Sequence, residues 1–72
     1  MNAAMAKKVR IPKPEEIKDF REKHGLSQRA LGEALGVSVR AVAMWEAGTR
    51  KPAKSAAILF WLYKKNPENL GA

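Results

Sequence analysis

Three glycines divide the middle of this chain into short segments and so limit what it can fold into. Gly25, Gly36 and Gly48 each follow a stretch of helix-compatible sequence. Glycine adopts the left-handed backbone conformation at no steric cost, so each of the three is predicted to end a helix. The alternation of apolar and polar residues that is typical of a half-buried strand is not sustained anywhere in the sequence. The pattern therefore predicts an all-α fold.

Four helices are expected from their start and stop signals. Proline is tolerated in the first turn of a helix, which places the first start near Pro14. Ser27 and Ser38 are favoured N-cap residues for the next two helices, and Asn66 with Pro67 stops the fourth. The expected ranges are about 14–24, 28–35, 39–47 and 54–65, with a short terminal turn after Pro67. This gives four to five short helices.

The chain reads as one domain preceded by an arm. Residues 1–13 carry four basic side chains and are predicted to form a flexible basic N-terminal arm, and residues 14–72 are expected to form the folded domain. A chain of 72 residues buries only about 60% of its unfolded surface, so its stability margin is thin. The sequence has no cysteine and one histidine. Disulfides are thus excluded, no metal or other cofactor is expected, and a partner chain is the remaining source of stability.

The charge balance narrows the class of partner. Lys and Arg number 14 against 7 Asp and Glu, a formal net charge of +7. Such a surface suits nucleic acid, an anionic membrane or an acidic protein. The longest apolar run, 56–63, is far shorter than the roughly 18 residues of a membrane span, and no secretory leader is recognisable. We therefore expect no membrane association and a cytoplasmic, nucleoid-associated protein.

The stretch from Gln28 to Trp45 carries the functional signal. It holds two short predicted helices joined by a turn that contains Gly36, which is the plan of a helix-turn-helix. The two helices of this motif cross steeply, so a small residue must lie where they touch, and Gly32 meets that need. Apolar residues would lock the pair to the core: Leu31, Leu35, Val37, Val42 and Trp45. The outer face of the second helix is then free to enter a DNA groove.

A longer set of positions at fixed spacing extends this pattern. It comprises Leu26-Ser27-Gln28, Leu31-Gly32, Leu35-Gly36-Val37-Ser38, Val42, Trp45-Glu46, Gly48 and Pro52. In these positions the chain resembles the Cro/phage-repressor helix-turn-helix family (the Xre type) over about residues 17–62. The resemblance implies a lambda-repressor-like fold and a DNA-binding transcriptional repressor. The chain departs from the family at Gly32, where alanine is usual, and glycine lowers helix stability by ~1 kcal/mol relative to alanine.

The run from Trp45 to Pro52 adds a finer similarity. Its pattern, Trp-Glu-x-Gly-x-Arg-x-Pro, is similar to that of HigA-like antitoxins, which repress their own toxin–antitoxin operons. The similarity implies a toxin partner. Some antitoxin relatives bind the toxin through an N-terminal zinc domain, which a chain without cysteine does not provide. A phage-type or stand-alone regulator with no toxin is the alternative.

The resemblance also implies roles for exposed positions of the motif. The base-contacting residues would be Ser38, Val39, Arg40, Ala43 and Met44. The phosphate-contacting residues would be Gln28, Arg29, Thr49, Arg50 and Lys51. Arg40 is the candidate for a bidentate contact to guanine O6 and N7, and the apolar side chains among the first set suit thymine methyl groups.

Several of these residues also have an ordinary structural interpretation. Arg40 and Gln28 can be solvated helix surface, and Met44 can belong to the core or to a dimer contact. Trp45 is expected in the core rather than stacked on a base, and His24 is expected to be structural. The lysines of the arm are either solvated charge or minor-groove readers.

The fourth predicted helix is apolar on every side over residues 56–63, so it must be covered on more than one side. One face can cover the core. The other, with Ile58, Trp61 and Leu62, is predicted to meet a second copy, although a toxin is a competing occupant. A homodimer would place two recognition helices ~34 Å apart on a palindromic operator of double-stranded DNA.

Other classes of protein fit the sequence less well. An enzyme is not expected, because no glycine cluster cradles a phosphate and the one histidine has no serine partner at a recognisable spacing. A membrane-surface helix would show a segregated basic face, whereas the basic residues of the fourth helix lie at its ends. An RNA-binding module is less well supported, because the sequence predicts no β-sheet whose aromatic side chains could stack on RNA bases. The main rival is a protein-interaction module that has lost DNA binding.

Overall fold

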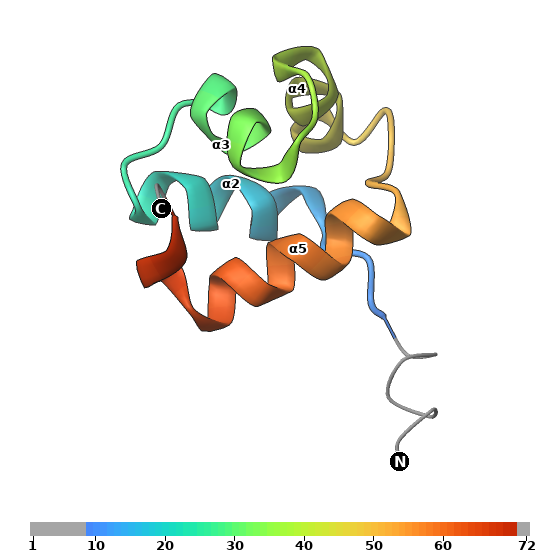
Figure 1. The fold of residues 1–72 in the computed structure, drawn as a ribbon. Helices are drawn as coiled ribbons and strands as arrows, with labels where there is room; N and C mark the ends of the chain where they lie inside the picture. The colour runs from blue at the N-terminus through green and yellow to red at the C-terminus, as the bar shows by residue number, and fades with distance from the viewer. Residues whose placement is uncertain (1–8, 71–72) are drawn as a thin grey trace.

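The structure, a computed structural model, describes residues 9–70 and consists of short helices (Figure 1). Its helices are α2 (Pro14–Lys23), α3 (Gln28–Leu35), α4 (Val39–Ala47) and α5 (Lys54–Lys65), followed by the 3-10 turn η1 (Pro67–Asn69). No strand occurs in the described part of the chain. The all-α, helix-turn-helix fold predicted from the sequence is thus confirmed.

The helix ends follow the local signals. Gly25, Gly36 and Gly48 have φ values of +66°, +72° and +80°, the left-handed conformation predicted for helix-ending glycines. Ser27 Oγ accepts a hydrogen bond from the backbone N–H of Ala30 at 2.9 Å, and Ser38 Oγ accepts one from Ala41 at 3.1 Å. These N-caps satisfy backbone donors that the first turn of a helix leaves without partners.

The core lies between a pair of helices and the motif that covers it. In Figure 1, α2 and α5 run side by side below α3 and α4. The rings of Phe20 from α2 and Phe60 from α5 meet edge to face, with centroids 5.2 Å apart. The other large buried side chains are Ile17 from α2 and, from the motif, Leu31, Leu35, Val42 and Trp45. The α3–α4 pair is therefore fixed to the same core as α2 and α5.

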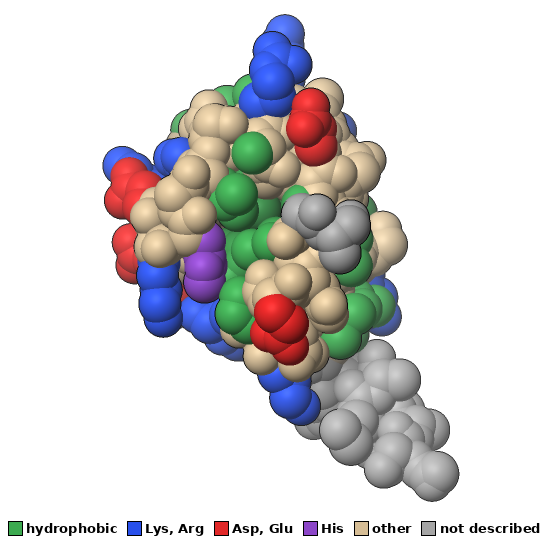
Figure 2. Space-filling model, turned by 60° about the vertical axis from the view of Figure 1, so that its left-hand side comes forward, with side chains coloured by type: hydrophobic (Ala, Val, Ile, Leu, Met, Phe, Trp, Pro, Cys, Tyr) green, Lys and Arg blue, Asp and Glu red, His purple; other side chains and the backbone are tan. Residues whose placement is uncertain are grey.

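His24 closes one end of this core. Its ring lies 4.6 Å from that of Phe20, centroid to centroid. Figure 2 views this end of the molecule, where apolar side chains reach the surface beside His24 (purple) and Lys and Arg side chains lie around them. The contact agrees with the structural role expected for this histidine.

The described part of the predicted arm is packed against the domain. Residues 1–8 lie outside the described residues, so the structure says nothing of their part in the arm. Pro12, however, is buried, and the indole N–H of Trp61 donates to the backbone oxygen of Arg10 at 2.6 Å. The Arg10 guanidinium lies 4.5 Å from the centre of the Trp61 ring. Residues 10–13, the described end of the predicted arm, are therefore packed against the helices, and the boundary expected at residue 14 stays a prediction.

An ion pair holds this segment from the other side. Arg10 donates to both carboxylate oxygens of Glu16, at 2.8 and 3.0 Å, and the backbone N–H of Lys13 donates to Glu16 Oε1 at 2.8 Å. Hydrogen bonds from Arg10 and Lys13 lower the pKa of Glu16 to about 2. The segment thus bridges the start of α2 and the outer side of α5.

Candidate nucleic-acid interface

The crossing of α3 and α4 depends on a residue without a side chain. Gly32 is buried, and a Cβ added there would lie 2.8 Å from the backbone oxygen of Val37 and 3.3 Å from that of Ser38. The turn is held against the helix by a 2.8 Å hydrogen bond from the Val37 N–H to the Gly32 carbonyl. The expectation that a small residue lies at this contact is confirmed, and here the spacing leaves no room for alanine without movement of the backbone.

This crossing fixes which side of α4 faces out. Val42 and Trp45 are 0% and 5% exposed and point into the core. Of the predicted base-contacting residues, Ser38, Val39 and Arg40 are exposed and Ala43 and Met44 are half-buried. Apart from Ala47 at its last position, the exposed residues of α4 thus lie in its first turn. Its N-terminal residues are those that a recognition helix presents to base edges.

The predicted phosphate-contacting residues fall into two groups. Gln28 is half-buried and Arg29 is exposed, both in the first turn of α3. Thr49, Arg50 and Lys51 are exposed in the loop after α4. Thr49 is tied to the end of α4, because its N–H and its hydroxyl donate to the Met44 carbonyl at 3.0 and 3.3 Å.

Arg21, Glu46 and Gln28 form a network that joins the two groups. The Nε2 of Gln28 donates to Glu46 Oε1 at 3.1 Å, which places the first turn of α3 beside the last turn of α4. Arg21 from α2 donates to both oxygens of Glu46 at 2.7 and 3.0 Å, and to the Leu26 carbonyl at 3.0 Å. Three segments are therefore locked around one carboxylate.

The electrostatics of Glu46 favour its ionised form. Burial opposes ionisation, but the hydrogen bonds from Arg21 and Gln28 outweigh it and lower the pKa of Glu46. The Glu46 hydrogen bond likewise raises the pKa of Arg21. The two side chains are only 8% and 15% exposed, so water screens the pair weakly.

No functional role was predicted for Glu46 or Arg21 from the sequence. A signal was present, however, because Glu46 is the only acidic residue between positions 34 and 67. It lies in the last turn of a helix, where the helix dipole disfavours a negative charge. An acid in such a place indicates a specific cationic partner.

Comparison with known families decides the identity of the motif. A family model described as helix-turn-helix matches residues 17–60, more than half of the chain. The chain belongs to the Cro/phage-repressor helix-turn-helix family. No curated protein was found to match it.

Membership of this helix-turn-helix family identifies the chain as a DNA-binding transcription regulator. The matched range begins at Ile17 in α2 and ends at Phe60 in α5, so it includes both the network around Glu46 and the exposed turn of α4. The stretch from 47 to 67 contains no acidic residue, while Arg50, Lys51 and Lys54 lie within it. The basic loop with Arg50 and Lys51, followed by Lys54 at the start of α5, suits a polyanion.

The three residues predicted at a dimer or partner interface are not equivalent in the helix-turn-helix domain. Ile58 and Leu62 are 43% and 53% exposed on α5, one helical turn apart. Trp61 is half-buried, and residue Arg10 of the same chain lies over its ring.

Within residues 9–70, no helix has the length and apolar character needed to cross a membrane.

Proposed function

We propose that this protein is a repressor that binds a palindromic operator as a homodimer and represses its own gene. The observation that carries the proposal is the exposed start of α4, with Ser38, Val39 and Arg40. The helix packs so closely on α3 at Gly32 that a Cβ there would lie 2.8 Å from the backbone oxygen of Val37. A rigid support is what a helix needs in order to present side chains to base edges in register. Arg40 would contact guanine, and Val39, Ala43 and Met44 would contact thymine methyl groups.

Phosphate contacts would come from both sides of this helix. Arg29, Arg50 and Lys51 are exposed cations, and Thr49 is an exposed hydroxyl. Gln28 would act with them, since its amide carries two N–H groups and the contact with Glu46 occupies one. Such contacts fix the register of a protein on DNA but do not read its sequence.

The homodimer would form through α5. Ile58 and Leu62 present exposed apolar surface that a second copy would remove from water. Trp61 would contribute less, because it is half-buried and Arg10 lies over its ring. Sedimentation measurements test this contact: Leu62→Asp should shift the protein to the monomer, whereas Asn69→Asp, a new acid on exposed η1, should not. Equal sedimentation of the wild type and Leu62→Asp would contradict a dimer through this face.

The biological setting we propose is that of an antitoxin in the cytoplasm. It is supported by the run Trp45 to Pro52, in which Trp45 is buried, Gly48 is left-handed and Pro52 is buried. The alternative is a regulator without a toxin. Co-expression with the protein encoded by the adjoining gene separates the two, because an antitoxin should co-purify with it and suppress its toxicity.

DNA binding is the first experiment. Affinity for the DNA upstream of the gene is measured by fluorescence anisotropy against a scrambled duplex of the same composition, at two salt concentrations. We expect tighter binding to the upstream DNA and a steep loss of affinity with salt. Equal weak binding to both duplexes would contradict operator recognition and favour a protein-interaction module.

A further inference from the structure

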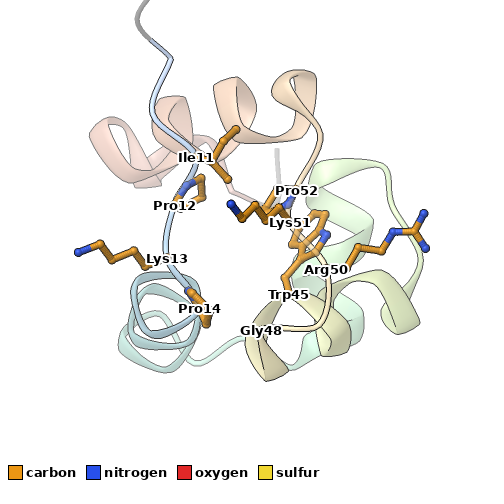
Figure 3. A pocket seen from close by; sticks show the side chains of 9 residues that line it. All are labelled: Ile11, Pro12, Lys13, Pro14, Trp45, Gly48, Arg50, Lys51 and Pro52. Carbon is orange, nitrogen blue, oxygen red and sulfur yellow. The ribbon is translucent and has the colours of Figure 1, made fainter.

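A cavity of about 270 Å³ separates the N-terminal segment from the loop after the recognition helix (Figure 3). One wall is formed by residues 11–14, and the other by Trp45, Gly48 and residues 50–52. The walls are close at one point, where a Cβ on Gly48 would lie 3.8 Å from Pro14 Cγ. The volume is slightly below that of typical drug-binding sites, so it suits a smaller molecule.

The chemistry of the lining favours an anion with an apolar body. Ile11, three prolines and the Trp45 ring supply apolar surface. Among the described residues that line the cavity, none is acidic, while Lys13, Arg50 and Lys51 are basic. Figure 3 shows Lys51 extending across the space toward the wall that contains Pro12, whereas Lys13 and Arg50 point outward on opposite sides. Lys51 is thus the cation placed to meet a ligand.

Both walls are anchored in ways that make the cavity a fixed feature. The N-terminal wall is held by the hydrogen bond from Trp61 to Arg10 and by the Arg10–Glu16 ion pair. The opposite wall is held by buried Trp45 and Pro52 and by the Thr49 bonds to Met44. Because the walls are already ordered, binding of a small ligand does not carry the entropy cost of ordering them.

We infer that this cavity is an effector site for a small aromatic or similarly flat organic carboxylate, held by Lys51 with its apolar body between Trp45 and Pro12. Lys51 also belongs to the loop proposed to contact phosphate, so the ligand and DNA compete for one ammonium group. Occupancy should therefore weaken DNA binding. This coupling rests on the proposed function, whereas binding of the carboxylate to the free protein does not.

The test uses benzoate as the probe and the uncharged benzamide as its control. Amide and indole N–H resonances of the full chain are followed by two-dimensional NMR during titration. We expect saturable shifts centred on the Trp45 indole, Gly48 and Ile11, with benzoate binding about fivefold more tightly than benzamide because of one exposed charge contact. Shifts that grow linearly without saturating, or that centre elsewhere, would overturn the site.

Three variants separate the contributions. Lys51→Met should reduce benzoate binding to the level of benzamide, and Lys54→Met, which removes the same charge from an exposed residue outside the lining, should not. Ile11→Phe should fill the cavity and abolish binding of both probes. If Lys54→Met has the same effect as Lys51→Met, the attraction is general and the site assignment fails.

The effect on DNA is measured on the upstream duplex in the same buffers, with chloride replacing benzoate as the control for ionic strength. Benzoate should weaken DNA binding by the wild type and leave the affinity of Ile11→Phe unchanged. Binding of benzoate with no effect on wild-type DNA affinity would overturn the coupling. Failure of the upstream duplex itself to bind would instead contradict the proposed function, and the NMR result on the free protein would still decide the site.

Discussion

The guanidinium of Arg21 donates two hydrogen bonds, of 2.7 and 3.0 Å, to the carboxylate of Glu46, a residue 25 positions further along the chain. The pair ties α2 to the end of the recognition helix, and Gln28 adds the start of α3. One carboxylate thus sets the orientation of α4 relative to two other helices. Its loss would affect both folding and the position of the residues proposed to contact DNA.

Removal of Arg21 should be costly. Arg21→Met keeps the apolar stem but leaves Glu46 weakly solvated and without its cation, so we expect a loss of about 2–3 kcal/mol in the free energy of unfolding. Urea unfolding at pH 7 measures it. Arg29→Met, at an exposed position, serves as the control and should stay within about 0.5 kcal/mol of the wild type. A similarly small effect at Arg21 would show that the pair contributes little.

Stability should fall in acid. The pKa values of Glu16 and Glu46 lie below the ordinary value of 4.5, at about 2 for Glu16. The unfolded state therefore binds protons first, and the stabilisation is complete above about pH 4.5 and lost as the pH falls toward 2. The free energy of unfolding should be flat from pH 7 to 5 and then decline.

Two variants test that origin. Glu46→Gln should be less stable at pH 7 and should show a shallower decline in acid, because one of the two titrating groups is gone. Glu16→Gln should reduce the part of the decline that salt screens, since Glu16 and Arg10 lie at the surface. An unchanged pH profile in both variants would assign the acid sensitivity to other groups.

Gly32→Ala should destabilise the protein although alanine is the better helix former. The gain in helix propensity is about 1 kcal/mol, but the new Cβ would lie 2.8 Å from the Val37 backbone oxygen. The turn must then shift, at a cost of about 1–3 kcal/mol, as for other overpacked sites. Thermal unfolding and DNA affinity should both fall. A variant more stable than the wild type by about 1 kcal/mol would mean that the turn adapts freely.

Trp61→Phe should release the N-terminal segment. It removes the N–H that bonds to the Arg10 carbonyl and weakens the attraction for the guanidinium over the ring. Trypsin should then cut after Arg10 faster than in the wild type, as followed by mass spectrometry. Tyr63→Phe, a change on the same helix without these contacts, is the control. Equal cleavage in all three proteins would argue against a stable packing of residues 10–13.

Arg40 and Arg50 should differ in how they affect DNA binding. If Arg40 contacts guanine, Arg40→Ala should cost about 1–3 kcal/mol on the operator and relax specificity at one base pair, and Arg40→Lys should restore it only in part. Arg50→Ala should weaken specific and scrambled DNA alike and reduce the salt slope by about one. An equal loss on both DNAs for Arg40→Ala would refute direct readout.

The helices could be predicted because their signals are local. Ser27, Ser38 and the left-handed glycines act on backbone groups within a few residues, so the bounds of α3 and α4 agree with the expected ranges. The end of α5 agrees because Pro67 disfavours helix at the residue before it. The need for a small residue at Gly32 was also predictable, since the motif itself requires two helices to touch there.

The contacts between residues far apart in the chain form only when the helices pack together. Periodicity indicated that α5 needs cover on more than one side, but it did not indicate that the chain's own Arg10, 51 residues away, covers Trp61. The cationic partner of Glu46 could not be predicted either, because several basic residues were candidates and only the packing of α2 against α4 brings Arg21 to it. Local signals were sufficient to predict where the helices begin and end and which residues are apolar. Pairing across the chain depends on the angles at which whole helices pack, and no local pattern records those angles.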